Sequence, residues 1–281
     1  MVLYVVPTPI GNIKDITYRA IEVLNECDII LCEDTRYCLK LLNYFNIKKK
    51  MIPYHKFNEF KLLDRVVKDI VNGNKYCLIS DAGMPGISDP GKLLINECIK
   101  NNIKVDVLPG ACALINGVVL NGFENEPFTF LGFLPRVKGK CVELLNKFRD
   151  LNTILVIYES PHRFLFTINL IREEFGDECL IYIGRELTKM FEENFRGNVK
   201  EAISHFEISN VKGEFVICIK NISKNEKEIS SNEILQIFNE NKENLNLTMK
   251  DNVKKICEEY GLKKNYVYDL VLNESKKQPH N

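Results

Sequence analysis

The sequence predicts an α/β protein built from two α/β domains with a ligand cleft between them, followed by a small helical extension. Three observations support this fold class. Short β-branched runs alternate with longer segments of helical periodicity, glycine-rich turns follow several of those runs, and a polar linker precedes helical patterns near the end of the chain. The expected domains are residues 1–115, residues 116–222 and, for the helical extension, residues 223–281.

Strands and helices alternate in the first domain, which is typical of a mainly parallel sheet covered by helices. The expected strands are residues 2–6, 28–32, 75–79 and 104–108. The expected helices are residues 16–27, 35–45, 58–73 and 91–102. In such sheets, ligands bind beyond the carboxyl ends of the strands, where the strand order reverses.

Glycine-rich turns follow three of these strands: residues 7–12 (PTPIGN), 80–91 (SDAGMPGISDPG) and 109–113 (PGACA). The second turn holds three glycines and two prolines in twelve residues. Glycine lets the main chain approach a ligand closely and exposes N–H and C=O groups that can bond it. Three such turns on one sheet edge predict a binding site, although residues 109–113 alone fit the start of a buried helix equally well.

The turns match no phosphate-binding signature. The sequence contains neither G-x-x-x-x-G-K-[ST] nor G-x-G-x-x-G. A nucleoside ligand without a polyphosphate therefore fits these turns better than ATP or NAD.

The second domain repeats the α/β pattern, and the extension is helical. The expected strands of the second domain are residues 153–158, 179–184 and 214–219, and its expected helices are residues 160–176 and 198–206. The extension is expected to hold helices at residues 233–241, 249–261 and 262–275. The last two have helix-turn-helix spacing. Because the charges of this segment cancel, we expect it to dock RNA or to pack, and not to bind DNA.

Polar side chains gather at the ends of several strands, in residues 32–36, 54–59, 158–163 and 185–197. They include carboxylates, imidazoles and cations: Asp34, Glu59, Glu159, Glu186, His55, His162, Arg36, Arg163, Arg185 and Lys189. Guanidinium groups suit phosphate oxygens, and a carboxylate or imidazole can accept a proton from a substrate hydroxyl. Each stretch alone also fits a helix cap or a surface ion pair, as Asp34 and Ser160 illustrate.

Composition excludes several classes of protein. With 281 residues, 45% of them hydrophobic and 27% charged, the chain should be globular. The formal net charge is zero, so any RNA contact must come from a local basic patch. The ten cysteines stand singly, which indicates buried thiols in a reducing cytoplasm and no zinc site. No apolar run approaches about 18 residues, so we expect a soluble protein without a membrane partner.

Eight motifs carry a resemblance to a known family. They are LYVVPTPIGN, EDTR, SDAGMPGISDPG, LPGACA, FLGFLPR, YESPHR, RELTK and KGEFV, in that order. The chain resembles the ribosomal RNA small subunit methyltransferase I family of the tetrapyrrole methylase superfamily over essentially its whole length. The resemblance implies S-adenosylmethionine as methyl donor and 2'-O-methylation of a decoding-site cytidine in 16S ribosomal RNA. It also implies a cofactor folded into the cleft between two α/β domains of the tetrapyrrole methylase type, and usually a homodimer.

The resemblance also implies the cofactor-binding positions. They are Pro7, Thr8, Asp81, Gly83, Met84, Ile87, Cys112, Ala113, Tyr158, Glu159, Glu186, Leu187 and Gly213. The chain departs from the family at Met84 and Gly86, where Thr and Leu are usual. Contacts made by the backbone would tolerate both changes. Asp81 fits a partner for the cationic end of the donor and, equally, a cap of the following turn.

Methyl transfer to a ribose hydroxyl needs in-line positioning and a base for the hydroxyl proton. We expect Glu186 or Glu159 to be that base, with Lys189 and Arg185 orienting the ribose and its phosphate. RNA should contact Arg36, Arg163 and the basic turn that contains Arg136, Lys138 and Lys140. Whether naked RNA or an assembled small subunit is the substrate stays open.

Two alternative functions remain at this point. One is methylation of a tetrapyrrole carbon within the same superfamily, and the other is a non-catalytic RNA-binding protein. The helical extension and the YESPHR and RELTK motifs argue against the first, and the intact glycine-rich turns argue against the second.

Overall fold

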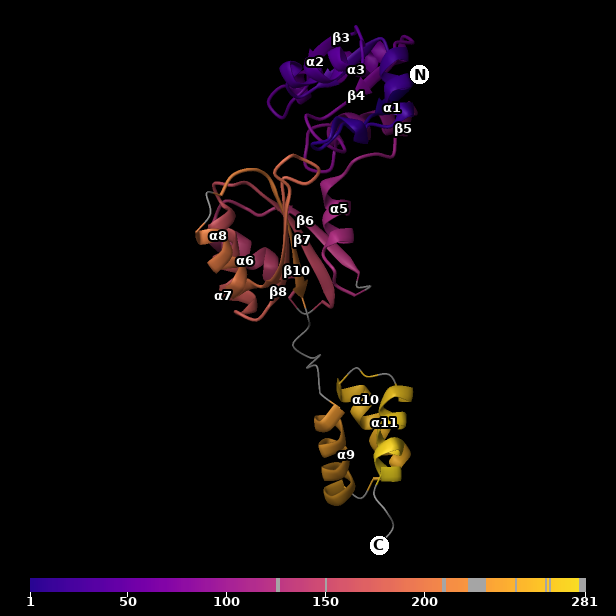
Figure 1. Ribbon diagram of the computed structural model, residues 1–281. Coiled ribbons are helices and arrows are strands. Elements are labelled where there is room, and N and C mark those ends of the chain that lie inside the picture. Colours follow the sequence, from indigo (N-terminus) through magenta and orange to yellow (C-terminus); the bar gives the residue numbers. More distant parts are fainter. Residues whose placement is uncertain are drawn as a thin grey trace. The chain divides into compact units, whose positions relative to one another are not determined.

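The computed structural model describes residues 1–124, 127–149, 151–208, 211–221, 231–245, 247–260, 262 and 264–277 (Figure 1). The chain forms two compact units. The first comprises Met1–Leu144 and Thr153–Lys220, and the second comprises Leu145–Asn152 and Asn221–Asn281. Among the residues that the structure describes, no helix combines the length and the apolar character needed to span a bilayer.

The first sheet of the larger unit has the strand order β3-β2-β4-β1-β5, and all four neighbouring pairs are parallel. Its strands are β1 (Val2–Val5), β2 (Ile29–Cys32), β3 (Lys50–Pro53), β4 (Tyr76–Leu78) and β5 (Lys104–Val107). The helices of this part are α1 (Tyr18–Glu26), α2 (Thr35–Tyr44), α3 (Glu59–Val71) and α4 (Lys92–Lys100), with a short 3-10 helix at Ile13–Asp15. The predicted parallel sheet is confirmed. The prediction missed β3, a half-exposed edge strand that ends in proline and lacks a buried apolar run.

Helices cover both faces of this sheet, which explains its continuously apolar strands. In β2, Ile29 and Leu31 pack with α3 and α4, whereas Ile30 and Cys32 pack with α1 and α2. Successive strand residues point to opposite faces, so a strand that is buried on both sides shows no polar alternation.

The second sheet of the larger unit is mixed and has the order β6-β7-β10-β8-β9. Its strands are β6 (Phe128–Phe133), β7 (Thr153–Glu159), β8 (Leu180–Arg185), β9 (Glu193–Asn198) and β10 (Phe215–Asn221). β6 pairs in parallel with β7, while β8 pairs antiparallel with β10 and β9. The two outer strands, β6 and β9, were missed by the prediction. β9 is polar, with the sequence ENFRGN, and β6 is only partly buried, so neither has the pattern of a core strand.

Helices flank the second sheet as well. Figure 1 shows α6 (Lys138–Asn146), α7 (Phe164–Phe175) and α8 (Val199–Glu207) on one side and α5 (Ala113–Leu120) on the other. Phe164 of α7 stacks on Phe215 of β10 with ring centroids 4.0 Å apart. On the other face, a Cβ atom on Gly117 of α5 would lie 2.5 Å from Val216 Cγ1. Glycine at this position therefore allows α5 to pack directly on β10.

The smaller unit contains α9 (Ser231–Leu245), α10 (Met249–Tyr260) and α11 (Lys264–Lys277). These helices share a hydrophobic core: Ile234, Phe238, Val253, Ile256, Val267 and Val271. Asn252 is buried beside this core, where its side-chain amide donates to Phe238 O at 2.7 Å. Most of the predicted polar linker, residues 222–230, lies outside the described residues.

Candidate active site

The three glycine-rich turns follow β4, β1 and β5, which are adjacent strands of the first sheet. Because these strands are parallel, their carboxyl ends lie on one edge and bring the turns together. Thr8 and Gly83 link the first two turns through a pair of backbone hydrogen bonds, each 3.0 Å long. The Thr8 hydroxyl also donates to Ser80 O at 3.0 Å. The predicted meeting of the turns is thus a fixed feature of the fold.

Glycine is required in these turns for two physical reasons. Gly83 has φ +84° and Gly91 has φ +127°, in the region that side chains rarely adopt. Gly110 needs space, because a Cβ atom there would lie 2.3 Å from Pro7 Cγ. The turn at residues 109–113 therefore lies directly against the first turn.

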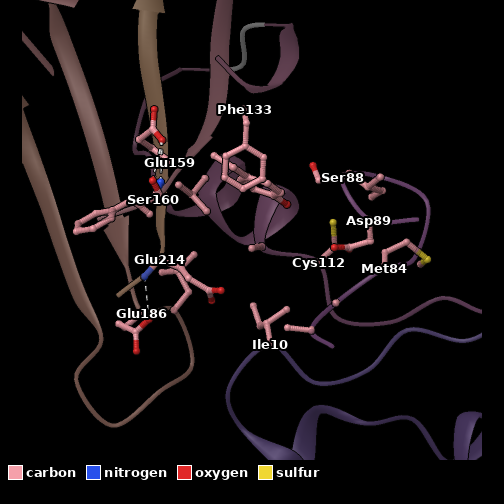
Figure 2. Close-up of a pocket in the computed structure, with 18 of the residues that line it drawn as sticks. Ile10, Met84, Ser88, Asp89, Cys112, Phe133, Glu159, Ser160, Glu186 and Glu214 are labelled. Atoms are coloured by element: carbon pink, nitrogen blue, oxygen red, sulfur yellow. Dashed lines mark hydrogen bonds between the residues drawn. The ribbon is translucent and has the colours of Figure 1, made fainter. Parts of the chain in front are cut away.

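The turns and the second sheet enclose a cavity of about 330 Å³ (Figure 2). Nine of the residues expected to bind the cofactor line it: Gly83, Met84, Ile87, Cys112, Ala113, Tyr158, Glu159, Glu186 and Leu187. Lys189, expected to orient the ribose, lines it too. The volume lies in the range of small-molecule sites, which starts at roughly 300 Å³.

Four of the expected cofactor residues do not line the cavity, and each makes another contact. Pro7 packs against Gly110, and Thr8 bridges to Gly83 and Ser80. Asp81 accepts a hydrogen bond from Asp34 N at 3.0 Å, and Gly213, with φ +93°, lies against the Glu186 side chain. Pro7, Thr8 and Asp81 thus hold the turns in place, whereas Gly213 packs against Glu186, a residue of the cavity lining.

Other residues line the cavity without having been expected there. They are Ile10, Ala82, Ser88, Asp89, Phe133, Ser160, Pro161, Glu214, Phe215 and Val216. Most of them stand in or beside the motifs that the sequence analysis singled out. Phe133 lies in the FLGFLPR motif but belongs to strand β6, which the sequence analysis did not predict, so it was not expected in the cavity.

Glu186, Lys189 and Glu214 form a network on the second-sheet side of the cavity. Lys189 Nζ donates to Glu186 Oε1 at 2.7 Å and to Glu214 Oε2 at 2.9 Å. Glu214 N also donates to Glu186 Oε1, at 2.9 Å, and Glu186 has φ +50°. Burial alone would raise the pKa of Glu186, but the hydrogen bonds from Lys189 and Glu214 N outweigh it and hold the pKa below its usual value. Glu186 is therefore a weakened proton acceptor.

Glu159 is the most buried carboxylate of the cavity wall, with 2% of its surface exposed. Its Oε1 accepts from Ser160 N at 2.8 Å, and its Oε2 accepts from the Thr167 hydroxyl at 2.7 Å. The adjacent Tyr158 hydroxyl accepts from Leu114 N at 2.8 Å, at the first turn of α5. Both oxygens of Glu159 thus already have partners inside the protein.

Arg185, which was expected to orient the ribose phosphate, does not line the cavity. Its Nε donates to Lys212 O at 2.7 Å, and its Nη1 bonds Glu193 at 3.0 Å. These contacts tie β8 to β9 and to the segment before β10.

Asp89 is a cavity residue of a different kind. It lies in the turn between β4 and α4. Burial, with the nearby Glu33 and Asp81 carboxylates, raises its pKa to about 6. Within the part of the chain that the structure describes, its carboxylate makes no hydrogen bond or ion pair.

The five residues expected to bind RNA lie outside the cavity lining. Arg36 pairs with Asp34 at 2.6 Å, and Asp34 also caps α2, which agrees with the alternative reading of that carboxylate. Lys138 pairs with Glu173 at 2.7 Å. Arg163 donates to Leu134 O and Pro135 O, each at 2.8 Å, and so holds the turn after β6.

Arg136 and Lys140 are exposed. Neither side chain has a hydrogen bond or an ion pair among the described residues.

Ser160 does not cap α7, which begins at Phe164 after Arg163, so the prediction that Ser160 caps a helix is wrong. Across the described part of the chain, no three His, Cys, Asp or Glu side chains are grouped so that they could hold a metal ion.

The parallel first sheet, the mixed second sheet and the enclosed cavity define a protein of the tetrapyrrole methylase class. The sequence model of the family described as Tetrapyrrole (Corrin/Porphyrin) Methylases matches residues 2–203. Solved structures with this fold include the methyltransferase CobJ (TM-score 0.60, 16% identity, 78% of this chain and 93% of that chain). They also include diphthine synthase (TM-score 0.61, 12% identity, 78% and 90%). A uroporphyrin-III C-methyl transferase from Thermus thermophilus complexed with S-adenosyl homocysteine has TM-score 0.56 and 14% identity, over 78% and 97%.

The chain belongs to the ribosomal RNA small subunit methyltransferase I family. The member from Mesomycoplasma conjunctivae is 43% identical over 82% of this chain and 95% of its own length. The member from Thermotoga maritima is 44% identical over 77% and 97%, and the member from Halalkalibacterium halodurans is 38% identical over 97% and 95%. The predicted fold class and the family resemblance are both confirmed.

Proposed function

We propose that the protein transfers the methyl group of S-adenosylmethionine to the 2'-oxygen of a decoding-site cytidine in 16S ribosomal RNA. Membership of the family supports an RNA of the small ribosomal subunit as substrate, and the motif resemblance supports the cytidine ribose. The choice of S-adenosylmethionine as methyl donor rests on the charge of the side chains that line the cavity. Four carboxylates and one ammonium group line it: Asp89, Glu159, Glu186, Glu214 and Lys189.

The residues of the cavity fit this donor. An excess of carboxylates favours a cationic ligand, such as a sulfonium with an α-ammonium group, and opposes a polyphosphate. Lys189, the one cation in the lining, is already paired with two of these carboxylates. Ile10, Met84 and Leu187 add apolar surface for an adenosine, and the glycine turns present main chain to it.

When bound, S-adenosylmethionine supplies an electrophilic methyl group on its sulfonium. We propose that main-chain groups at Gly83, Cys112 and Ala113 hold the donor, with Met84, Ile87 and Leu187 packing beside it. Pro7, Thr8 and Asp81 then act indirectly, by fixing the turns, and Gly213 acts by packing against Glu186. Tyr158 holds the first turn of α5 through its hydrogen bond from Leu114 N. Glu159 holds Ser160 and Thr167 through the hydrogen bonds that it accepts from them. The network of Glu186, Lys189 and Glu214 forms the wall that faces the methyl acceptor, and Arg185 ties the neighbouring strands β8 and β9 together. Positioning of this kind supplies a large part of the acceleration in group transfer.

The test is methylation of small ribosomal subunits from cells that lack this activity, with methyl-labelled S-adenosylmethionine, followed by mapping of the labelled nucleotide. We expect label on a ribose 2'-oxygen of the decoding site. Label on a base, or on a different RNA, would contradict the proposed acceptor and identify another one. Label on uroporphyrinogen in a parallel reaction, with none on subunits or naked RNA, would favour the tetrapyrrole alternative.

We propose that RNA docks on the basic turn after β6. The exposure and lack of partners of Arg136 and Lys140 support this surface, whereas Arg163 has an internal role. Changing Arg136, Lys138 and Lys140 together to alanine should weaken RNA binding and lower the slope of log affinity against log salt by about two to three. Filter binding at several salt concentrations measures both quantities.

The matched control for this experiment removes the same number of charges elsewhere. Lys48, Lys49 and Lys50 lie at the start of β3 and just before it, at the amino end of the first sheet. Their triple alanine variant should bind RNA within threefold of the wild type. Equal losses in the two variants would contradict the proposed docking surface.

We further propose that the protein is a homodimer that acts in the cytoplasm. Ile115 and Val119, four residues apart on α5, are 48% and 77% exposed, which supports a protein partner for this helix. The ten cysteines are all free thiols, which suits a reducing compartment. Sedimentation equilibrium measures the oligomeric state, and a monomer at micromolar concentration would contradict the dimer.

A further inference from the structure

We propose that Asp89 is the proton acceptor of the reaction, so that its carboxylate takes the proton from the acceptor hydroxyl as the methyl group is transferred. This inference rests on the proposed function. It assigns the base to a residue that sequence reasoning passed over in favour of Glu186 and Glu159.

The position of Asp89 in the cavity is fixed by its neighbours in the chain. It is followed by Pro90, which has a restricted backbone, and by Gly91, where a Cβ atom would lie 2.5 Å from Leu78 Cδ2. The turn is therefore pressed onto the end of β4. Figure 2 shows Asp89 with Ser88 and Cys112 on one side of the cavity, and Glu159, Glu186 and Glu214 on the opposite side.

Comparison of the four carboxylates in the cavity lining favours Asp89. Both oxygens of Glu159 accept hydrogen bonds from within the protein. Glu186 and Glu214 share the Lys189 ammonium. Asp89 has no such partner among the described residues, so its oxygen lone pairs are free to accept a proton from a bound substrate.

The electrostatic surroundings also suit a base. Burial, together with the charges of Glu33 after β2, Asp81 in the same turn and Glu214 before β10, raises the pKa of Asp89 to about 6, while Lys56 after β3 opposes them. Tyr158 on β7 faces the same space: burial raises the pKa of its hydroxyl, and the Asp89 charge adds to that effect. A carboxyl group with a pKa near 6 is ionised at neutral pH yet binds a proton more strongly than an ordinary aspartate.

The step balances in atoms and charge. The O–H bond of the acceptor breaks and its proton goes to a carboxylate oxygen of Asp89. The electron pair of that O–H bond stays on oxygen, which forms the new O–C bond while the C–S bond breaks with its pair left on sulfur. A sulfonium and a carboxylate thus become a neutral thioether and a neutral carboxylic acid, and Asp89 afterwards releases its proton to water.

The test is Asp89→Asn, which keeps the shape of the side chain and removes its charge. We expect single-turnover methyl transfer to small subunits to fall by about 100-fold or more. Because three carboxylates still line the cavity in this variant, calorimetry should find the affinity for S-adenosylmethionine within tenfold of the wild type. The wild-type rate should fall about tenfold per unit of pH below about 6, whereas the residual rate of the variant should not follow that profile.

A second readout needs no activity. Because the folded-state pKa of Asp89 lies above its unfolded value of 3.8, ionisation of this group opposes folding, and its effect on stability grows as pH rises through about 6. Asp89→Asn should therefore melt at a higher temperature than the wild type at pH 7.5, and the gap should narrow as pH falls below 6 and close near 3.8. Asp64→Asn, on the exposed side of α3, is the matched control and should show neither effect.

Three outcomes would overturn the inference. One is a variant rate within threefold of the wild type, and another is the absence of a pH-dependent melting gap. The third is a loss of S-adenosylmethionine affinity greater than tenfold, because Asp89 would then hold the cationic donor instead of accepting a proton. If the wild type transfers no methyl group to any RNA, the proposed function fails, and the melting experiment still decides whether Asp89 carries the raised pKa.

Discussion

Replacing Gly110 with alanine should weaken S-adenosylmethionine binding by about tenfold or more and lower the free energy of unfolding by about 1–3 kcal/mol. The added methyl group would lie 2.3 Å from Pro7 Cγ and 3.0 Å from Pro7 Cβ. A proline ring cannot rotate away, so the backbones of two turns must separate. Those turns form one side of the cavity, and their displacement misplaces every donor contact made by main chain.

Gly139→Ala is the matched control for this prediction. Gly139 lies in the first turn of α6, and a Cβ atom there meets nothing within 4 Å. Alanine favours a helix over glycine by up to about 1 kcal/mol, so this variant should bind the donor normally and be at least as stable as the wild type. Calorimetry and urea unfolding measure both variants. Normal donor affinity in Gly110→Ala would show that contact between the two turns is not needed for the site.

Lys189→Met should lower the free energy of unfolding by about 1–2 kcal/mol at pH 7.5, and methyl transfer by about tenfold. The change leaves the Glu186 and Glu214 carboxylates without the ammonium that they share. The Glu214 side chain is 75% exposed, so water screens its charge and most of the loss should arise at Glu186. The segment that contains Glu186 and Thr188, both at positive φ, also loses the contact that holds it.

The effect of Lys189→Met on stability should depend on pH in a defined direction. In the wild type the pKa of Glu186 lies below its unfolded value, so its ionised form stabilises the fold above about pH 4.5 and this contribution is lost as pH falls through the folded pKa. The gap between variant and wild type should therefore be largest above pH 5 and shrink on acidification. Lys100→Met removes an exposed ion pair with Glu97 on α4, and as a control it should change stability by less than about 0.5 kcal/mol. A pH-independent gap for Lys189→Met would show that lost packing, not lost charge, is responsible.

The sequence was sufficient to predict the parallel sheet and the edge that carries the site. β1, β2 and β4 have apolar runs, and each glycine-rich turn directly follows a predicted strand. The order of the strands was not predictable, yet it matters, because the site depends on β4, β1 and β5 being neighbours. β3, β6 and β9 were missed because they are only partly buried and do not show the pattern of a core strand.

Individual side chains were harder to predict than the turns. Asp89 stands in a Ser-Asp-Pro-Gly stretch that is typical of an ordinary turn, and its raised pKa depends partly on the charge of Glu33, far away in the sequence. Arg163 suggested a phosphate ligand, but its guanidinium holds carbonyl groups 28 and 29 residues earlier in the chain. Contacts of this kind are set by tertiary packing and leave no local pattern.

The main-chain contacts proposed for the methyl donor have a consequence for the evolution of this fold. In the proposed function these turns hold the donor mainly through backbone groups, so a change of side chain at a position such as Met84 should be tolerated better than a change at Gly83, Gly91 or Gly110. The opposite wall is built from side chains, chiefly Glu159, Glu186 and Lys189, and single replacements there alter what it can recognise. If the two walls act as proposed, point mutations in the second wall can change the acceptor while the glycine-rich turns continue to bind the same donor.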